Sequence, residues 1–180
     1  MSKKIQWMAE IAILSALSLT LDYVSALIGG ALWPQGGSIS IAMVPIMIVS
    51  YRWGIKSGVT CGLIVGTIQL FWGEAAGLLA IILDYVFAYG VVGLAGIFNS
   101  QMKRANKQLP MIYFIGGILL TFLLRFSSHV ASGVLVYEVP FWGSVTYNIG
   151  YLGISFVLSG ILVMLMYLKT PQLVFRDSVN

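Results

Sequence analysis

Long apolar segments with very few charges limit what this chain can fold into. Of its 180 residues, 59% are hydrophobic and only 9% are charged, and the mean hydropathy is +0.94. A soluble domain carries about 25% charged residues, so this chain cannot cover a surface that faces water. We infer that lipid surrounds it. A membrane-spanning helix needs roughly 20 apolar residues, and six segments meet or approach that length: 5–28, 38–53, 54–72, 77–101, 110–136 and 142–168.

These segments predict an all-α membrane protein, a six-transmembrane-helix bundle that forms a single integral membrane domain over residues 1–180. The second segment is the shortest and begins with the polar sequence SIS. In such a bundle nearly all basic residues lie at one level, and cytoplasmic loops are the ones enriched in Lys and Arg. We therefore expect both termini to be cytoplasmic. The basic residues at this level are Lys3, Lys4, Arg52, Lys56, Lys103, Arg104, Lys107, Lys169 and Arg176.

Several classes of protein are excluded by what the sequence lacks. The first apolar segment is too long for a cleavable signal peptide, and no small-residue cleavage site follows it. Cys61 is the only cysteine, which excludes a disulfide framework and a cysteine metal site. There is no phosphate-binding G-x-x-x-x-G-K-[ST] loop and no H-E-x-x-H metal motif. The net charge of +4 follows from the basic loops and needs no nucleic acid. If such a protein binds a ligand in a pocket, it would depend on a partner protein for its source of energy.

Small residues recur at helical spacing in two segments. Gly54, Gly58, Gly62 and Gly66 follow one another at intervals of four, and small residues allow the close backbone approach that holds membrane helices together. We expect this stripe to pack on a neighbouring helix. In the first segment Ala12 and Ala16 have the same spacing. Their spacing fits internal packing and a docking face for another membrane protein equally well.

Polar groups inside the apolar segments point to a pocket. Charged residues at membrane depth are costly and usually face a bundle interior or a cavity. We counted the depth of each polar residue from the outer boundary at ~1.5 Å per residue. Four polar residues lie roughly 10 Å deep, and Arg125 lies one turn deeper. The sequence thus predicts a polar layer nearer the outside, with a structural role favoured for Asp22. The four residues at the common depth are Asp22, Asp84, His129 and Asn148.

Aromatic residues gather at the same level, where they could form an interfacial belt or the wall of a pocket. Tyr85 follows Asp84 and Tyr147 precedes Asn148, and an aromatic face beside a carboxylate suits a flat cationic ligand. Two structural alternatives remain open: an ion pair between Asp84 and Arg125, and a neutral His129 bonded to a backbone carbonyl. The other aromatics at this level are Trp33, Tyr137, Trp142 and Tyr151.

Five motifs resemble one family of membrane proteins, in a match that runs in order over residues 12–152. They are WPQGGSISIAMVPI, YRWGIKSGV, LDY..AYG.VGLAG, LLRFSSHVASGV and YN.GYL. Together they are similar to the thiamin-specific S-component of energy-coupling factor (ECF) transporters. The resemblance implies a six-helix bundle in a prokaryotic plasma membrane with both termini cytoplasmic. It also implies a subunit that binds thiamin from outside and docks onto a transmembrane coupling subunit carrying two ATP-binding subunits.

The resemblance assigns roles residue by residue. Docking falls on Ala12 and Ala16. The depth of Arg125, and not the resemblance, leads us to expect that it stands behind the residues that would touch the ligand. Two positions depart from the family pattern: Tyr137 stands where a tryptophan is expected, and Val86 where a proline commonly follows the carboxylate–tyrosine pair. Trp142 and Tyr147 are candidates for further aromatic contacts. The substrate-binding residues implied are Trp33, Asp84, Tyr85, His129, Gly133, Tyr137, Trp142, Tyr147 and Asn148.

The leading hypothesis is a thiamin-binding transporter subunit that is not an enzyme and needs no cofactor or metal. One alternative is an S-component for another aromatic vitamin or a pyrimidine precursor. A second is a small membrane enzyme that uses Asp84 and His129 as acid and base. A third is a structural membrane subunit that binds no small molecule.

Overall fold

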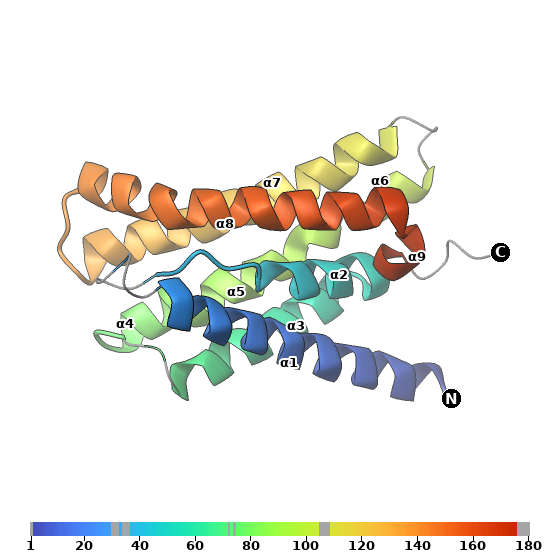
Figure 1. Ribbon diagram of the computed structural model, residues 1–180, viewed down its shortest axis with the longest axis horizontal. Coiled ribbons are helices and arrows are strands. Elements are labelled where there is room, and N and C mark those ends of the chain that lie inside the picture. Colours follow the sequence, from blue (N-terminus) through green and yellow to red (C-terminus); the bar gives the residue numbers. More distant parts are fainter. Residues whose placement is uncertain are drawn as a thin grey trace.

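The structure is a computed structural model that describes residues 2–29, 33, 37–71, 73, 75–104 and 109–175. Over these residues it consists of helices and connecting segments, with no strand. Figure 1 shows the long helices running roughly side by side along the molecule. The elements are α1 (Lys3–Gly29), α2 (Met43–Trp53), α3 (Ile55–Ile68), η1 (Gln69–Phe71), α4 (Leu78–Ala80), η2 (Ile81–Phe87), α5 (Ala88–Gly90), η3 (Val91–Phe98), α6 (Asn99–Arg104), α7 (Leu109–Leu135), α8 (Phe141–Lys169) and α9 (Pro171–Val174).

Four helical stretches are long and apolar enough to cross a membrane by length and composition. They are Lys3–Ile28, Leu78–Met102, Met111–Leu135 and Phe141–Lys169, and Ile55–Phe71 is shorter. The second of them runs continuously from α4 to α6 and departs twice from the α-helical hydrogen-bond pattern, in a π-helical turn at η2 and a 3₁₀ stretch at η3. The all-α prediction is confirmed by the described residues, and the four predicted segments at these places agree with the structure within a few residues.

The second predicted segment, 38–53, is wrong as a continuous spanning helix. Only α2 is helical there, and its 11 residues span about 16 Å against a hydrocarbon thickness of about 30 Å. Residues 37–41 are not helical. The reason is visible in their hydrogen bonds, since the Ser40 amide donates to Ser155 Oγ at 2.9 Å and Ser18 Oγ donates to the Ala42 carbonyl at 2.6 Å. Side chains of neighbouring helices satisfy this backbone in place of a helical turn.

Helix α2 is the centre of the bundle. Every residue from Met43 to Tyr51 is buried, which explains why the sequence of this helix shows no polar face. Pro45 lies in its first turn, where the missing N–H has no helical partner in any case. Between α2 and α3 the chain turns at Gly54, whose φ of +88° is readily adopted only by glycine. Gly54 thus belongs to the predicted stripe by spacing but serves the turn.

Apart from Arg125, the basic residues that the structure describes lie toward one end of the bundle. The start of α1, the end of α2, α6 and α9 lie together at this end, and α4 with the α7–α8 connection lies at the other (Figure 1). Arg52 joins three helices there, because its Nε donates to Glu10 Oε2 of α1 at 2.7 Å and its Nη1 donates to the Gln172 carbonyl of α9 at 2.7 Å. The expected positions Lys107 and Arg176 lie outside the described residues.

The remaining glycines of the stripe bring α3 into backbone contact with the Leu78–Arg104 stretch. A Cβ added at Gly58 would lie 2.5 Å from the Gly93 carbonyl oxygen. Cβ atoms at Gly62 and Gly66 would collide with the carbonyl oxygens of Tyr89 and Tyr85. The prediction that this stripe packs on a neighbouring helix is confirmed for these three positions.

We predict that Gly62→Ala destabilises the protein, because the obstructing atom is backbone and cannot swing aside. Overpacking of this kind costs about 1–3 kcal/mol. Gly160→Ala on α8 is the matched control, since its Cβ would meet only Ile118 Cγ2 at 3.9 Å, an ordinary contact. Thermal unfolding in detergent measures both variants. Equal melting temperatures for Gly62→Ala and the control would contradict the packing described here.

Candidate functional site

A cavity of about 800 Å³ lies among the helices, within the size range of small-molecule sites. Its walls come from α1, the non-helical segment 37–41, the start of α2, the η2–α5 region, α7 and α8. Non-helical backbone at membrane depth is tolerated where it is buried in protein or lines a cavity. Gly37, Ser38 and Ser40 of the segment 37–41 line this one, so the break in the second predicted helix and the cavity belong together.

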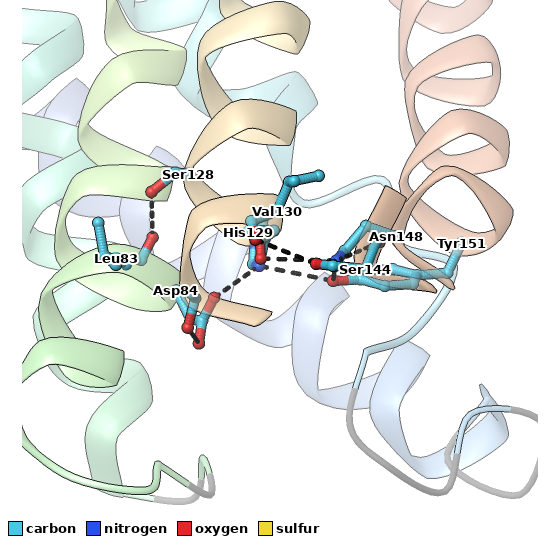
Figure 2. A network of polar contacts seen from close by, with 9 residues as sticks. Leu83, Asp84, Ser128, His129, Val130, Ser144, Asn148 and Tyr151 are labelled. Atoms are coloured by element: carbon cyan, nitrogen blue, oxygen red, sulfur yellow. Dashed lines mark hydrogen bonds and ion pairs between the residues drawn. The ribbon is translucent and has the colours of Figure 1, made fainter. Parts of the chain in front are cut away.

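Asp84 is the centre of the first polar group, which joins η2 to α7. Its Oδ1 lies 3.0 Å from His129 Nδ1 (Figure 2). Ser132 Oγ donates to its Oδ2 at 2.5 Å. The side chains of His129 and Asp84 are 11% and 17% exposed. An ionised carboxylate only accepts hydrogen bonds, so this contact places the His129 proton on Nδ1 when the imidazole is neutral. Nε2 then presents a lone pair, and it makes no hydrogen bond to any residue that the structure describes.

A chain of hydrogen bonds links His129 to α8. Tyr151 Oη donates to Asn148 Oδ1 at 2.8 Å and lies 3.5 Å from His129 Nδ1. Asn148 Nδ2 donates to the Ser144 carbonyl at 2.9 Å, and Ser144 Oγ donates to the Val130 carbonyl at 3.0 Å. Figure 2 shows these groups meeting between α7 and α8. The network holds the amide and the imidazole in fixed positions at the cavity wall.

The second polar group joins α1, η1, α5 and α7. Tyr89 Oη donates to Asp22 Oδ1 at 2.7 Å. Gln69 Nε2 donates to Asp22 Oδ2 and, at 2.8 Å, to Tyr89 Oη. The guanidinium carbon of Arg125 lies 3.9 Å from the centre of the Tyr89 ring, an arrangement stabilised by cation–π attraction. Asp22, Gln69, Tyr89 and Arg125 all line the cavity.

These contacts decide between the structural alternatives. Asp84 pairs with His129, and Arg125 lies over Tyr89, so the ion pair between Asp84 and Arg125 is not the arrangement found among the described residues. The His129 ring faces a carboxylate and a phenol at its Nδ1 and not a backbone carbonyl. The structural role expected for Asp22 is consistent with its bonds to two helices, although it also borders the cavity.

The structure brings nearly all predicted site residues to this cavity. Trp33 contacts the Tyr151 ring edge-on, with 6.2 Å between the ring centroids, and a Cβ at Gly133 would overlap Ser144 Oγ of α8. These predicted residues share a place in the wall of the cavity. The predicted residues found there are Trp33, Asp84, Tyr85, Arg125, His129, Gly133, Tyr137, Tyr147 and Asn148.

Trp142 is the exception, because the structure does not place it at the cavity. Its side chain is 73% exposed and it is not among the cavity-lining residues. It lies in the first turn of α8, where its ring packs edge-on against Phe141 with 5.3 Å between centroids. This exposure fits the interfacial-belt alternative.

Ala12 and Ala16 are both exposed on α1 and do not line the cavity, which argues against internal packing within this chain.

Sequence reasoning assigned no site role to Gln69, Tyr89 or Ser132, which all line the cavity. Tyr151, named there only among the aromatics that could wall a pocket, lines it as well. Helical spacing could have found two of the three, because Tyr89 lies four residues after Tyr85 and Ser132 lies three after His129. Gln69 is an amide in an apolar segment and carried the same signal as Asp22.

The chain resembles known proteins over nearly its whole length. Residues 8–175 match the family described as Thiamine transporter protein (Thia_YuaJ). It is 34% identical to the thiamine transporter ThiT of Bacillus subtilis, covering 98% of this chain and 97% of that protein. It is 24% identical to the ThiT of Lacticaseibacillus paracasei, covering 79% of this chain and 71% of that protein.

A solved structure shares the fold. The structure of ThiT from Listeria monocytogenes matches with a TM-score of 0.74 and 24% identity, over 97% of this chain and 100% of that one. The likeness in fold agrees with the match in sequence, which extends through every helix that lines the cavity. The chain therefore belongs to the thiamine transporter protein family.

Proposed function

We propose that this protein is the thiamin-binding membrane subunit of an ECF-type vitamin importer. The observation that carries the proposal is the cavity of about 800 Å³ in which Asp84, His129 and aromatic side chains meet, in a chain of a thiamine transporter family. Thiamin joins a permanently cationic thiazolium to a neutral aminopyrimidine. It therefore needs a carboxylate, hydrogen-bond acceptors and aromatic faces, and this cavity provides all three.

Charge explains the central role proposed for Asp84. A cation entering a partly dehydrated pocket is disfavoured unless a negative group meets it. Arg125 opposes a cation, and Asp22 is its counter-charge, since Asp22 accepts from the hydroxyl of the Tyr89 ring over which the guanidinium lies. Asp84 accepts two bonds within the protein, and a carboxylate has about four acceptor sites. Asp84 thus has capacity left for the ligand's amino group or its charge, and the lone pair of His129 Nε2 offers a second acceptor.

We further propose that the chain crosses the membrane six times, with both termini in the cytoplasm of a prokaryotic cell. The short α2 spans about 16 Å, and the five non-helical residues 37–41 can extend up to about 17 Å. Together they match a hydrocarbon thickness of about 30 Å. The basic end that holds Lys3, Lys4, Arg52 and Lys169 then faces the cytoplasm, because these residues lie at one end of the bundle.

Transport would require a partner, and we propose that Ala12 and Ala16 contact it. Both alanines are exposed on α1, and small residues permit the close approach of another membrane helix. The partner proposed is the transmembrane coupling subunit of an ECF module that carries two ATP-binding subunits.

The enzyme alternative with Asp84 and His129 loses support because the family is one of transporters. Another aromatic vitamin stays as the alternative ligand.

The first prediction of this proposal concerns Asp84. Asp84→Asn keeps the shape and removes the charge, so it should weaken thiamin binding. Loss of one charge-assisted hydrogen bond costs about 1.5–3 kcal/mol, or very roughly ten- to a hundredfold in affinity. Titration calorimetry on the purified protein measures this. Glu10→Gln makes a comparable change in the Arg52 cluster near the start of α1 and should leave the affinity unchanged. Unaltered binding by Asp84→Asn would defeat the proposed role.

The second prediction concerns docking. Ala12→Trp or Ala16→Trp should abolish thiamin uptake by cells and leave binding by the purified subunit intact, because a bulky ring would hold two helix backbones apart. Leu158→Trp is the control, since Leu158 on α8 is 42% exposed and lies outside the docking face. Loss of binding in the purified alanine variants would show that these positions serve the fold of the subunit itself.

A further inference from the structure

Arg125 lines the cavity and has hydrogen-bond donors for which the described residues provide no acceptor. Its side chain is only 8% exposed and lines the cavity. Nε and Nη1 are buried and make no hydrogen bond to any residue that the structure describes. A guanidinium stays charged in proteins and has only donors, and leaving buried donors without acceptors is costly.

The surroundings of Arg125 define what kind of acceptor suits it. The guanidinium lies over the Tyr89 ring, and the Tyr89 hydroxyl donates to the Asp22 carboxylate. Asp22 is therefore a counter-charge for Arg125, with only the Tyr89 side chain between them. The positive charge of Arg125 is thus already balanced in this part of the cavity. An anionic ligand group would bring a negative charge close to Asp22, whereas an uncharged oxygen or nitrogen acceptor would not. The geometry favours an uncharged acceptor.

We propose that Arg125 is a specificity-determining residue that donates hydrogen bonds to an uncharged acceptor atom of the bound ligand. The inference rests on the proposed function. The two polar groups would then bind opposite chemistry: Asp84 and His129 Nε2 accept from donors on the ligand, and Arg125 donates to its acceptors. Thiamin has two sources of such an acceptor, the hydroxyl oxygen of its side chain and the nitrogens of its pyrimidine ring.

The arrangement would orient the ligand as well as hold it. Arg125 precedes His129 by four residues on α7, so the donor lies about 6 Å along the helix axis from the acceptor. A ligand inserted the wrong way round would set its amino group against the guanidinium and an acceptor against the Asp84 carboxylate. Both contacts are repulsive, and mispaired polar groups of this kind are how buried sites reject wrong partners.

The test is a cycle that changes the protein and the ligand together. Wild type and Arg125→Met are each titrated with thiamin, with the analogue lacking the hydroxyl, and with analogues in which one pyrimidine nitrogen is replaced by C–H. In wild type, removing the contacted acceptor should weaken binding about ten- to a hundredfold. In Arg125→Met the same ligand change should alter affinity less than about twofold. The analogue that shows this coupling identifies the hydroxyl or the ring as the source.

Arg52→Met removes a guanidinium at the basic end of the bundle and is the matched control, which should show the wild-type ligand differences. If Arg125→Met binds none of the ligands, Arg125→Lys replaces it, and the ligand difference should shrink because a single ammonium cannot reproduce the fork. Equal affinity of wild type for thiamin and every analogue would overturn the inference, as would a ligand difference that persists in the Arg125 variants. Failure of wild type to bind thiamin would instead overturn the proposed function, and this inference with it.

Discussion

The contact between α3 and the Leu78–Arg104 stretch is the constraint on which the site depends. Lipid is as apolar as leucine, so membrane helices are held by close backbone approach and not by apolar burial. Gly58, Gly62 and Gly66 allow that approach, and the backbone they meet belongs to Gly93, Tyr89 and Tyr85. Tyr85 and Tyr89 line the cavity, and Asp84 lies beside Tyr85. The same packing that holds two helices together therefore positions the carboxylate and two aromatic rings.

Serine hydroxyls connect the other helices to this pair. Ser128 Oγ donates to the Leu83 carbonyl at 2.5 Å, which ties α7 to the π-helical turn just before Asp84 (Figure 2). Ser144 Oγ makes the equivalent link from α8 to α7. π-helical turns occur often at functional sites, and here the turn carries Asp84 and Tyr85. Helix α7 is thus joined by direct hydrogen bonds both to the π-helical turn and to α8.

The cavity separates two kinds of polar chemistry. Around Asp84 and His129 the protein offers acceptors, and around Arg125 it offers donors. Both groups border a wall that includes irregular backbone, where Ser40 and Ala42 are held by side chains of α8 and α1. A transporter subunit of this family needs a site that recognises both ends of a small ligand and excludes lipid. In the proposed function, these two groups would meet that need with few charged residues.

Composition and spacing alone determined much of this protein. The scarcity of charge indicates helices in lipid, and the basic residues identify one end of the bundle. The glycines at intervals of four predict a contact between helices. All three conclusions follow from local chemistry. Asp84, His129 and Asn148 could be singled out for the same reason, since a polar group in an apolar helix needs a partner. Partner choice was beyond the sequence: Asp84 with His129, Arg125 over Tyr89, and Ser155 with the backbone of Ser40 are contacts across helices. The break before α2 and the outward position of Trp142 were decided in the same way. Hydropathy reports that a residue is apolar, and only tertiary structure decides whether lipid, a neighbouring helix or the cavity receives it.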